Sequence, residues 1–229
     1  MNNTLQLRKI GGFSGVTIAL LCLTTTAQAT QFIQTADKLG SNDSLSWDSL
    51  GKVFNPAIPG PPAFLPFSID ATSKQGLGVN VSLPPKPGST PPFVFRNALP
   101  PNGIPANFAL NDFVLFTGLQ LGAPVPTPGN PGPLTLRFAK PVFGVGAQFS
   151  VDDTPSFTAF IDAYDRHDKL IGHFSRPGFA STQPDNSAIF LGVRSRRPNI
   201  AKVVFRSSAA NQAIGIGTLR LVTKPKYRH

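Results

Sequence analysis

Hydrophobic and polar residues alternate along the second half of the chain. Apolar side chains fall at every second position of 134–139, 145–151 and 157–164. This period of two is typical of a β-strand that has one face on an apolar core. The polar segment 165–169 predicts a turn. Further strands are expected at 170–174, 189–193, 201–205 and 214–222.

The first half of the chain is divided by proline. Eighteen of the 24 prolines lie between Pro56 and Pro133. Proline lacks the amide proton that a central strand donates, so this region cannot be sheet throughout. The sequence therefore predicts loops, with short strands between them, and residues 42–50 form one helical turn or a short strand. The loops are 55–66, 84–92, 100–105 and 124–133, and the strands are 77–83, 93–95 and 113–116.

Short strands joined by polar turns predict an all-β fold, an antiparallel sandwich of two sheets with long Pro-rich loops. A closed barrel is the alternative. The chain contains no Glu at all, which disfavours a helical bundle. One domain over residues 30–222 is expected, followed by a basic tail at 223–229.

Residues 1–29 have the pattern of a Sec-type signal peptide. Arg8 and Lys9 precede an uncharged stretch at 10–23, and Ala27-Gln28-Ala29 matches a cleavage site. A membrane anchor is the alternative, but the stretch is short for a spanning helix. Cleavage after Ala29 would leave a cysteine-free chain, secreted or periplasmic, without a transmembrane anchor.

Several blocks occur in an order that resembles a group of secreted bacterial proteins of the PEP-CTERM-associated type. These blocks are SLSWDSLG (44–51), FALNDFVLFTG (108–118), FAKPVFGVGAQFS (138–150), FTAFIDAYDRHDKLIGHF (157–174), AIFLGVRSRRPNIAKVVFRSS (188–208) and AIGIGTLRLV (213–222). The resemblance implies an exported, jelly-roll-like β-sandwich with no established enzymatic activity. It implies no catalytic residue.

The chain departs from that group in two ways. Relatives often have the pattern Ile-Asp-Asp-Leu in the last strand, where this chain has Ile216-Gly217-Thr218-Leu219. A calcium role for an acidic pair there is therefore not expected. The Pro-Glu-Pro sorting tail is also absent, which argues against surface anchoring by that route.

The best local candidate for ligand contact lies in the strand at 157–164. Asp162 alternates with Phe160 and Tyr164, so the three share one strand face. Aromatic surfaces beside a few polar groups are typical of ligand sites, and this face could line a sugar site. Alternatively, Asp162 lies at the edge of an exposed sheet and the rings pack on a loop.

Catalytic and metal chemistry is not expected. Asp152, Asp153, Asp162, Asp165 and Asp168 do not have the spacing of a calcium loop, and a solvated turn explains Asp165 and Asp168 better. His167 and His173 lack a third zinc ligand. No activated serine or carboxylate pair is singled out. We therefore expect no enzyme, no metal and no cofactor.

Positive charge is concentrated at the end of the chain. Residues 191–229 contain nine Lys or Arg and no acid, whereas residues 30–190 contain ten bases and eleven acids. Arg194, Arg196 and Arg197 form the densest group. Such a region attracts polyanions, although a generically basic exported protein is an equal interpretation. No recognisable nucleic-acid motif accompanies it.

These observations predict an exported, non-enzymatic binding protein for acidic glycans at the cell envelope or in extracellular matrix. Its ligand contacts would be Arg194, Arg196 and Arg197, together with Phe160, Asp162 and Tyr164. The alternative is a structural matrix protein that associates with itself through the Pro-rich loops. A secreted hydrolase is the third possibility.

Overall fold

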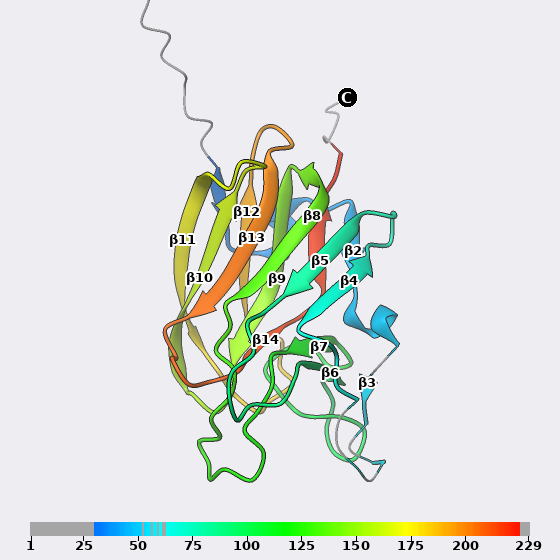
Figure 1. Cartoon of the computed structure of the whole chain (residues 1–229), viewed down its shortest axis with the longest axis vertical. Coiled ribbons are helices and arrows are strands. Elements are labelled where there is room, and N and C mark those ends of the chain that lie inside the picture. The colour runs from blue at the N-terminus through cyan, green and yellow to red at the C-terminus, as the bar shows by residue number, and fades with distance from the viewer. Residues whose placement is uncertain (1–29, 52, 56, 59, 61–62, 225–229) are drawn as a thin grey trace, which may run out of the picture.

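Two β-sheets pack face to face in this protein (Figure 1). The computed structural model describes residues 30–51, 53–55, 57–58, 60 and 63–224. The predicted all-β, two-sheet class is confirmed, and the two sheets are separate, so the barrel alternative is wrong. The predicted signal peptide and residues 225–229 of the basic tail lie outside the described residues.

The first sheet has six strands, and every neighbouring pair in it is antiparallel. Its edge strands are β11 and β4. In spatial order the strands are β11 (Leu170–Phe179), β10 (Ser156–Tyr164), β13 (Ile200–Ser207), β8 (Leu134–Val142), β5 (Gly78–Ser82) and β4 (Ser68–Thr72).

The second sheet has nine strands, and only the pairing of β3 with β6 is parallel. One short strand, β15, pairs with both β2 and β9. The main path runs through β1 (Gln31–Ile33), β12 (Ile189–Arg194), β9 (Gly144–Val151), β14 (Ile214–Ile216), β7 (Phe113–Phe116), β6 (Phe93–Arg96) and β3 (Val53–Phe54), with β15 (Leu219–Val222) and β2 (Asp43–Leu45) beside it.

The strand predicted at 214–222 is interrupted. β14 and β15 both run along β9, but the register advances by one residue between Ile216, opposite Phe149, and Arg220, opposite Gly146. An extra residue of this kind is a β-bulge. At the bulge the carbonyl of Gly217 accepts a hydrogen bond from the indole nitrogen of Trp47, 2.8 Å away.

Other boundaries also differ from the prediction. Residues 42–50 contain both predicted forms, since β2 is followed by a single turn of 3-10 helix, η1 (Trp47–Leu50). The pattern did not predict β1, β4 or the short helix α1 (Ala36–Leu39). β11 continues past Pro177, which an edge strand tolerates because the missing amide faces no neighbour.

The core lies between the sheets and consists of the alternate side chains predicted to be buried. Phe149 of β9 comes from the nine-stranded sheet, and Phe157 and Phe205 come from the six-stranded sheet. The ring centroid of Phe149 is 5.8 Å from that of Phe157 and 6.3 Å from that of Phe205. These aromatic contacts join the two layers directly.

The two ends of the sandwich are built differently. Tight turns close one end, at the top of Figure 1, whereas the Pro-rich loops lie at the other. No helix within the described part of the chain is long and apolar enough to cross a membrane.

Replacing Phe149 with Ala should remove the contact between the layers. We expect the free energy of unfolding to fall by about 3–5 kcal/mol, because a large buried side chain leaves a cavity. Phe179→Ala is the control, since Phe179 is 61% exposed, and it should cost less than about 0.5 kcal/mol. Urea denaturation measures both, and equal losses would contradict the assignment of Phe149 to the core.

Candidate functional site

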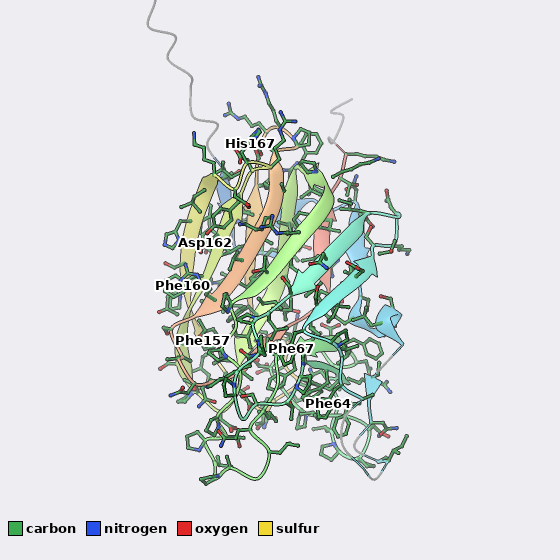
Figure 2. The ribbon with its side chains drawn as sticks, in the orientation of Figure 1. Phe64, Phe67, Phe157, Phe160, Asp162 and His167 are labelled. Atoms are coloured by element: carbon green, nitrogen blue, oxygen red, sulfur yellow. The ribbon has the colours of Figure 1, made fainter. Side chains whose placement is uncertain are left out.

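Phe160, Asp162 and Tyr164 lie on one face of β10, as the alternation predicted. Their neighbours Ala159, Ile161 and Ala163 are fully buried between the sheets, so this face is the outer one. Figure 2 shows Phe160 and Asp162 on this strand and His167 at the turn beyond it. The three predicted residues therefore belong to the solvent side of the six-stranded sheet.

Asp162 is nevertheless buried, because neighbouring strands supply partners that cover it. His173 of β11 stands directly opposite, and its Nδ1 lies 2.5 Å from Oδ1 of Asp162. From β13, Arg206 donates hydrogen bonds to Oδ2 through Nε, at 3.0 Å, and through a terminal nitrogen, at 2.6 Å. Both carboxylate oxygens are thus occupied, and Asp162 positions Arg206 and His173.

The same two residues flank the ring of Phe160. The guanidinium carbon of Arg206 lies 5.2 Å from the ring centroid, in cation–π geometry. The imidazole of His173 is nearly parallel to the ring, with the centroids 6.1 Å apart. Phe160 therefore helps to hold two basic groups in place.

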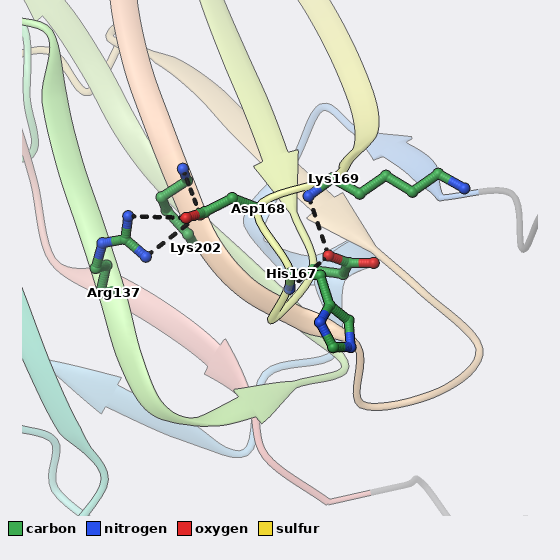
Figure 3. A network of polar contacts seen from close by, with 6 residues as sticks. Arg137, His167, Asp168, Lys169 and Lys202 are labelled. Atoms are coloured by element: carbon green, nitrogen blue, oxygen red, sulfur yellow. Dashed lines mark hydrogen bonds and ion pairs between the residues drawn. The ribbon is translucent and has the colours of Figure 1, made fainter.

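A second network joins the turn between β10 and β11 to the sheet (Figure 3). The carboxylate of Asp168 pairs with Arg137 of β8 at 3.3 Å and with Lys202 of β13 at 2.7 Å. Lys202 also lies 4.0 Å from the centroid of Tyr164. The hydrogen bond from Lys202, and then that from Arg137, holds the pKa of Asp168 below its usual range.

Asp165 stabilises the same turn through the backbone. Its Oδ1 accepts hydrogen bonds from the amides of His167, at 2.8 Å, and Lys169, at 3.1 Å. The amide of His167 is the main cause of a lowered pKa for Asp165. The acids of this turn are therefore committed to internal contacts, and Arg166 and Lys169 remain exposed beside them.

The three predicted arginines differ in their surroundings. Arg194 is half-buried and donates a 2.7 Å hydrogen bond to the carbonyl of Leu39, which ties α1 to the end of β12. Arg196 and Arg197 are exposed in the turn between β12 and β13. The basic residues of β13 and β15 do not gather with them on one face. Lys202 and Arg206 lie on the outer face of the six-stranded sheet, and Arg220 lies in the nine-stranded sheet.

Exposed cations from five separate segments do share one end of the sandwich. The register places the turns after β4, β8, β10 and β12 at this end, together with the residues that follow β15. We call this surface the basic end, and it consists of Lys74, Lys140, Arg166, Lys169, Arg196, Arg197 and Lys224. None of these seven side chains forms an ion pair with another described residue.

The histidines and acids do not assemble a further centre. Within residues 30–224 as described, no group of three His, Cys, Asp or Glu side chains could hold a metal ion. His173 contacts Asp162, and His167 contacts Arg166. In the same part of the chain no serine hydroxyl hydrogen-bonds to either imidazole.

The sequence did not single out Arg137, Lys202 or Arg206 as partners of the β10 face. Their positions depend on the register of β10, β13 and β8, which lie far apart in the chain. The contact between His173 and Asp162 could have been predicted from the sequence. Pairing the two strands outward from the turn at 165–169 places these residues nearly opposite each other.

Comparison with known proteins does not assign this chain to a family. No family model matches the sequence, and no curated protein matches it. A DUF4465 family protein from Bacteroides caccae is structurally similar over 86% of this chain and 100% of its own, at 10% identity and a TM-score of 0.37. Accessory secretory protein 1, 2 and 3 of Streptococcus pneumoniae aligns over 78% of this chain and 95% of its own, at 10% identity and a TM-score of 0.18.

The Asp162–Arg206 pair can be tested by a double-mutant cycle. Asp162→Asn and Arg206→Gln should each lower the free energy of unfolding, with a coupling energy of about 1–3 kcal/mol, because the buried carboxylate accepts two charge-assisted bonds. The exposed Asp168–Arg137 pair, changed to Asn and Gln, should couple more weakly. A coupling energy near zero for the first pair would contradict this account.

Proposed function

We propose that the protein is an exported, non-enzymatic binding protein that attaches to acidic polysaccharide through its basic end. The proposal combines the signal-peptide pattern of residues 1–29, the resemblance to secreted PEP-CTERM-associated proteins and the charge of this surface. The periplasm, the cell envelope or the extracellular matrix would then be its place of action.

The observation that carries the proposal is the set of seven exposed cations at the basic end, none in an ion pair within the described residues. The two acids of the turn at 165–169 form no ion pair with these cations. Asp168 is bound to Arg137 and Lys202, and Asp165 accepts from backbone amides. A surface of this kind raises the local concentration of polyanions by long-range attraction.

The spacing of the cations favours a polymer over a small anion. The strands that supply Lys74 and Lys169 lie at opposite sides of the six-stranded sheet, with four strands between them. At about 4.8 Å per strand, the cations are distributed over roughly 24 Å. A chain of carboxylated sugars can contact such a surface at several points, whereas a single small anion meets one or two cations.

Removing basic-end cations should weaken binding to alginate. We expect Arg166→Ser, Arg196→Ser and Arg197→Ser each to raise the Kd about fivefold, since one cation near an anionic surface contributes about 1 kcal/mol. Added salt should weaken the wild-type complex, because exposed charges are screened. Binding is measured by biolayer interferometry on immobilised alginate, with neutral dextran as the negative surface.

Arg96→Ser is the matched control. Arg96 is exposed at the end of β6 in the nine-stranded sheet, outside the basic end, and also carries one positive charge. It should change the Kd less than twofold. Equal effects of Arg96→Ser and Arg196→Ser would mean that only net charge matters, and that result would refute a localised site.

Self-association through the loops is the second candidate function, and exposed apolar side chains favour it. The Pro-rich half of the chain presents five large hydrophobic residues to solvent, and Val125 is 81% exposed. Exposed apolar groups that gather at one end are a common basis of association between proteins. The residues are Ile58, Leu99, Leu110, Leu121 and Val125.

If this second candidate holds, the protein should form concentration-dependent dimers or larger species without glycan. Sedimentation velocity across a hundredfold concentration range measures this. Leu121→Ser with Val125→Ser should shift the equilibrium toward monomer, whereas Leu170→Ser, at the turn end, should not. A strict monomer at the highest concentration would exclude association through the loops.

A further inference from the structure

The outer side of the nine-stranded sheet carries a cavity of about 450 Å³ at the loop end of the molecule. Its floor is a row of residues on four neighbouring strands, which the register places side by side. This row runs from Ser150 of β9 through Gly215 of β14 and Phe116 of β7 to Phe93 of β6. The floor is therefore part of the rigid sheet.

The loop between β6 and β7 forms one wall. Asn97 organises this loop, because its buried amide donates to the carbonyls of Phe108 and Ala109 and accepts from the amide of Ala106. The loop thereby brings Phe108 down onto Gly215. A Cβ at position 215 would lie 3.4 Å from the Phe108 ring, so the ring packs directly over this part of the sheet.

Four phenylalanine rings and several aliphatic groups make the cavity mainly apolar. The rings belong to Phe93, Phe95, Phe108 and Phe116, each no more than 8% exposed. Its volume lies within the range of small-molecule sites, roughly 300–1,000 Å³. Polar groups stand at the margin, on segments 152–155 and 180–183.

The charged groups that line the cavity are all acidic. Asp152 and Asp153 contribute carboxylates, and no Lys, Arg or His is among the lining residues that the structure describes, although the full chain has a net charge of +10. Asp153 is engaged, since its Oδ2 accepts from the amide of Thr127 at 2.7 Å. Asp152 forms no ion pair with any residue that the structure describes.

Two further observations indicate that this polar margin is incomplete. Burial, and then the charge of Asp153, raises the pKa of Asp152 to about 6. The carboxylate is thus mostly ionised at pH 7 but poorly stabilised. Asn107, which also lines the cavity, is 1% exposed, and its Oδ1 has no hydrogen-bond partner among the described residues. Buried polar atoms without a partner are rare in folded proteins.

We infer that this cavity binds a small organic cation, a protonated amine on an apolar body, with the ammonium beside Asp152 and the body among the phenylalanine rings. An ammonium supplies the charge that the lining lacks. Ring faces attract cations through their quadrupole and also cover apolar surface. This site lies at the opposite end from the basic end and is independent of polysaccharide binding.

The test compares three probes with one carbon skeleton, namely 4-phenylbutylamine, 4-phenylbutanol and 4-phenylbutanoate. Titration followed by ¹H–¹⁵N NMR at pH 7 should place shift changes at residues 104–108, 150–155 and 180–183. For ligands of this size we expect a Kd near 1 mM or somewhat below for the amine. The alcohol should bind at least about fivefold more weakly, and the acid should not bind measurably.

Asp152→Asn should abolish the preference for the amine and leave binding of the alcohol unchanged. The matched control is Asp185→Asn, which removes an exposed carboxylate of the neighbouring loop that does not line the cavity. It should retain the preference. Arg196→Ser should also retain it, so failure at this cavity is separate from failure at the basic end.

A measurement on the wild-type protein keeps the inference testable if Asp152→Asn does not fold. Saturation with the amine should lower the pKa of Asp152, read from its side-chain ¹³C shift, whereas the alcohol should not. Among the described residues, Asp153 is the only other titratable side chain that lines the cavity, and it serves as reference. Equal binding of the three probes, or no binding of any, would overturn the inference. Occupation of the cavity by a second copy in a dimer would also overturn it.

Discussion

The contact of Phe149 with Phe157 and Phe205 across the two sheets is the interaction on which the rest of the structure depends. Strands such as β8 and β10 commit alternate side chains to this shared core, where all three rings are at most 6% exposed. The intervening residues must therefore face outward. Everything proposed about binding concerns these outer residues and the two ends, because the inner positions are occupied by packing.

The two ends differ in chemistry because they differ in construction. Tight turns between long strands hold short polar segments, and their carboxylates are used within the turn or bound to the sheet, as at Asp165 and Asp168. Their cations remain exposed. At the other end, the loops rich in proline cover an aromatic cluster on the outside of the nine-stranded sheet, and the carboxylates of Asp152 and Asp153 stand beside it.

Much of the fold could be predicted from local patterns. Period-two alternation placed β8, β9 and β10, and it placed Phe160, Asp162 and Tyr164 on one outer face. Proline located the loops, but short strands such as β1 and β4 carry too few alternating residues to stand out.

Less of the candidate sites could be predicted, because they depend on contacts between distant segments. Asp162 gave no sign that it would be buried, since Arg206 lies 44 residues away and reaches it only through the pairing of β10 with β13. The aromatic cavity arises in the same way. Its floor joins residues of β6, β7, β9 and β14, and its wall depends on Asn97, a single polar residue in a loop.

The central claim is that polyanions bind at the basic end and not at the loop end. Amide chemical shifts test this claim most directly. Alginate oligomers of defined length would be titrated into ¹⁵N-labelled protein and followed by ¹H–¹⁵N NMR. The account predicts shift changes confined to the turns at 73–77, 165–169 and 195–199, to residues 140–143 at the end of β8, and to residues 223–224. Changes centred on the loops at 84–92 and 118–133, or spread evenly over both ends, would contradict it.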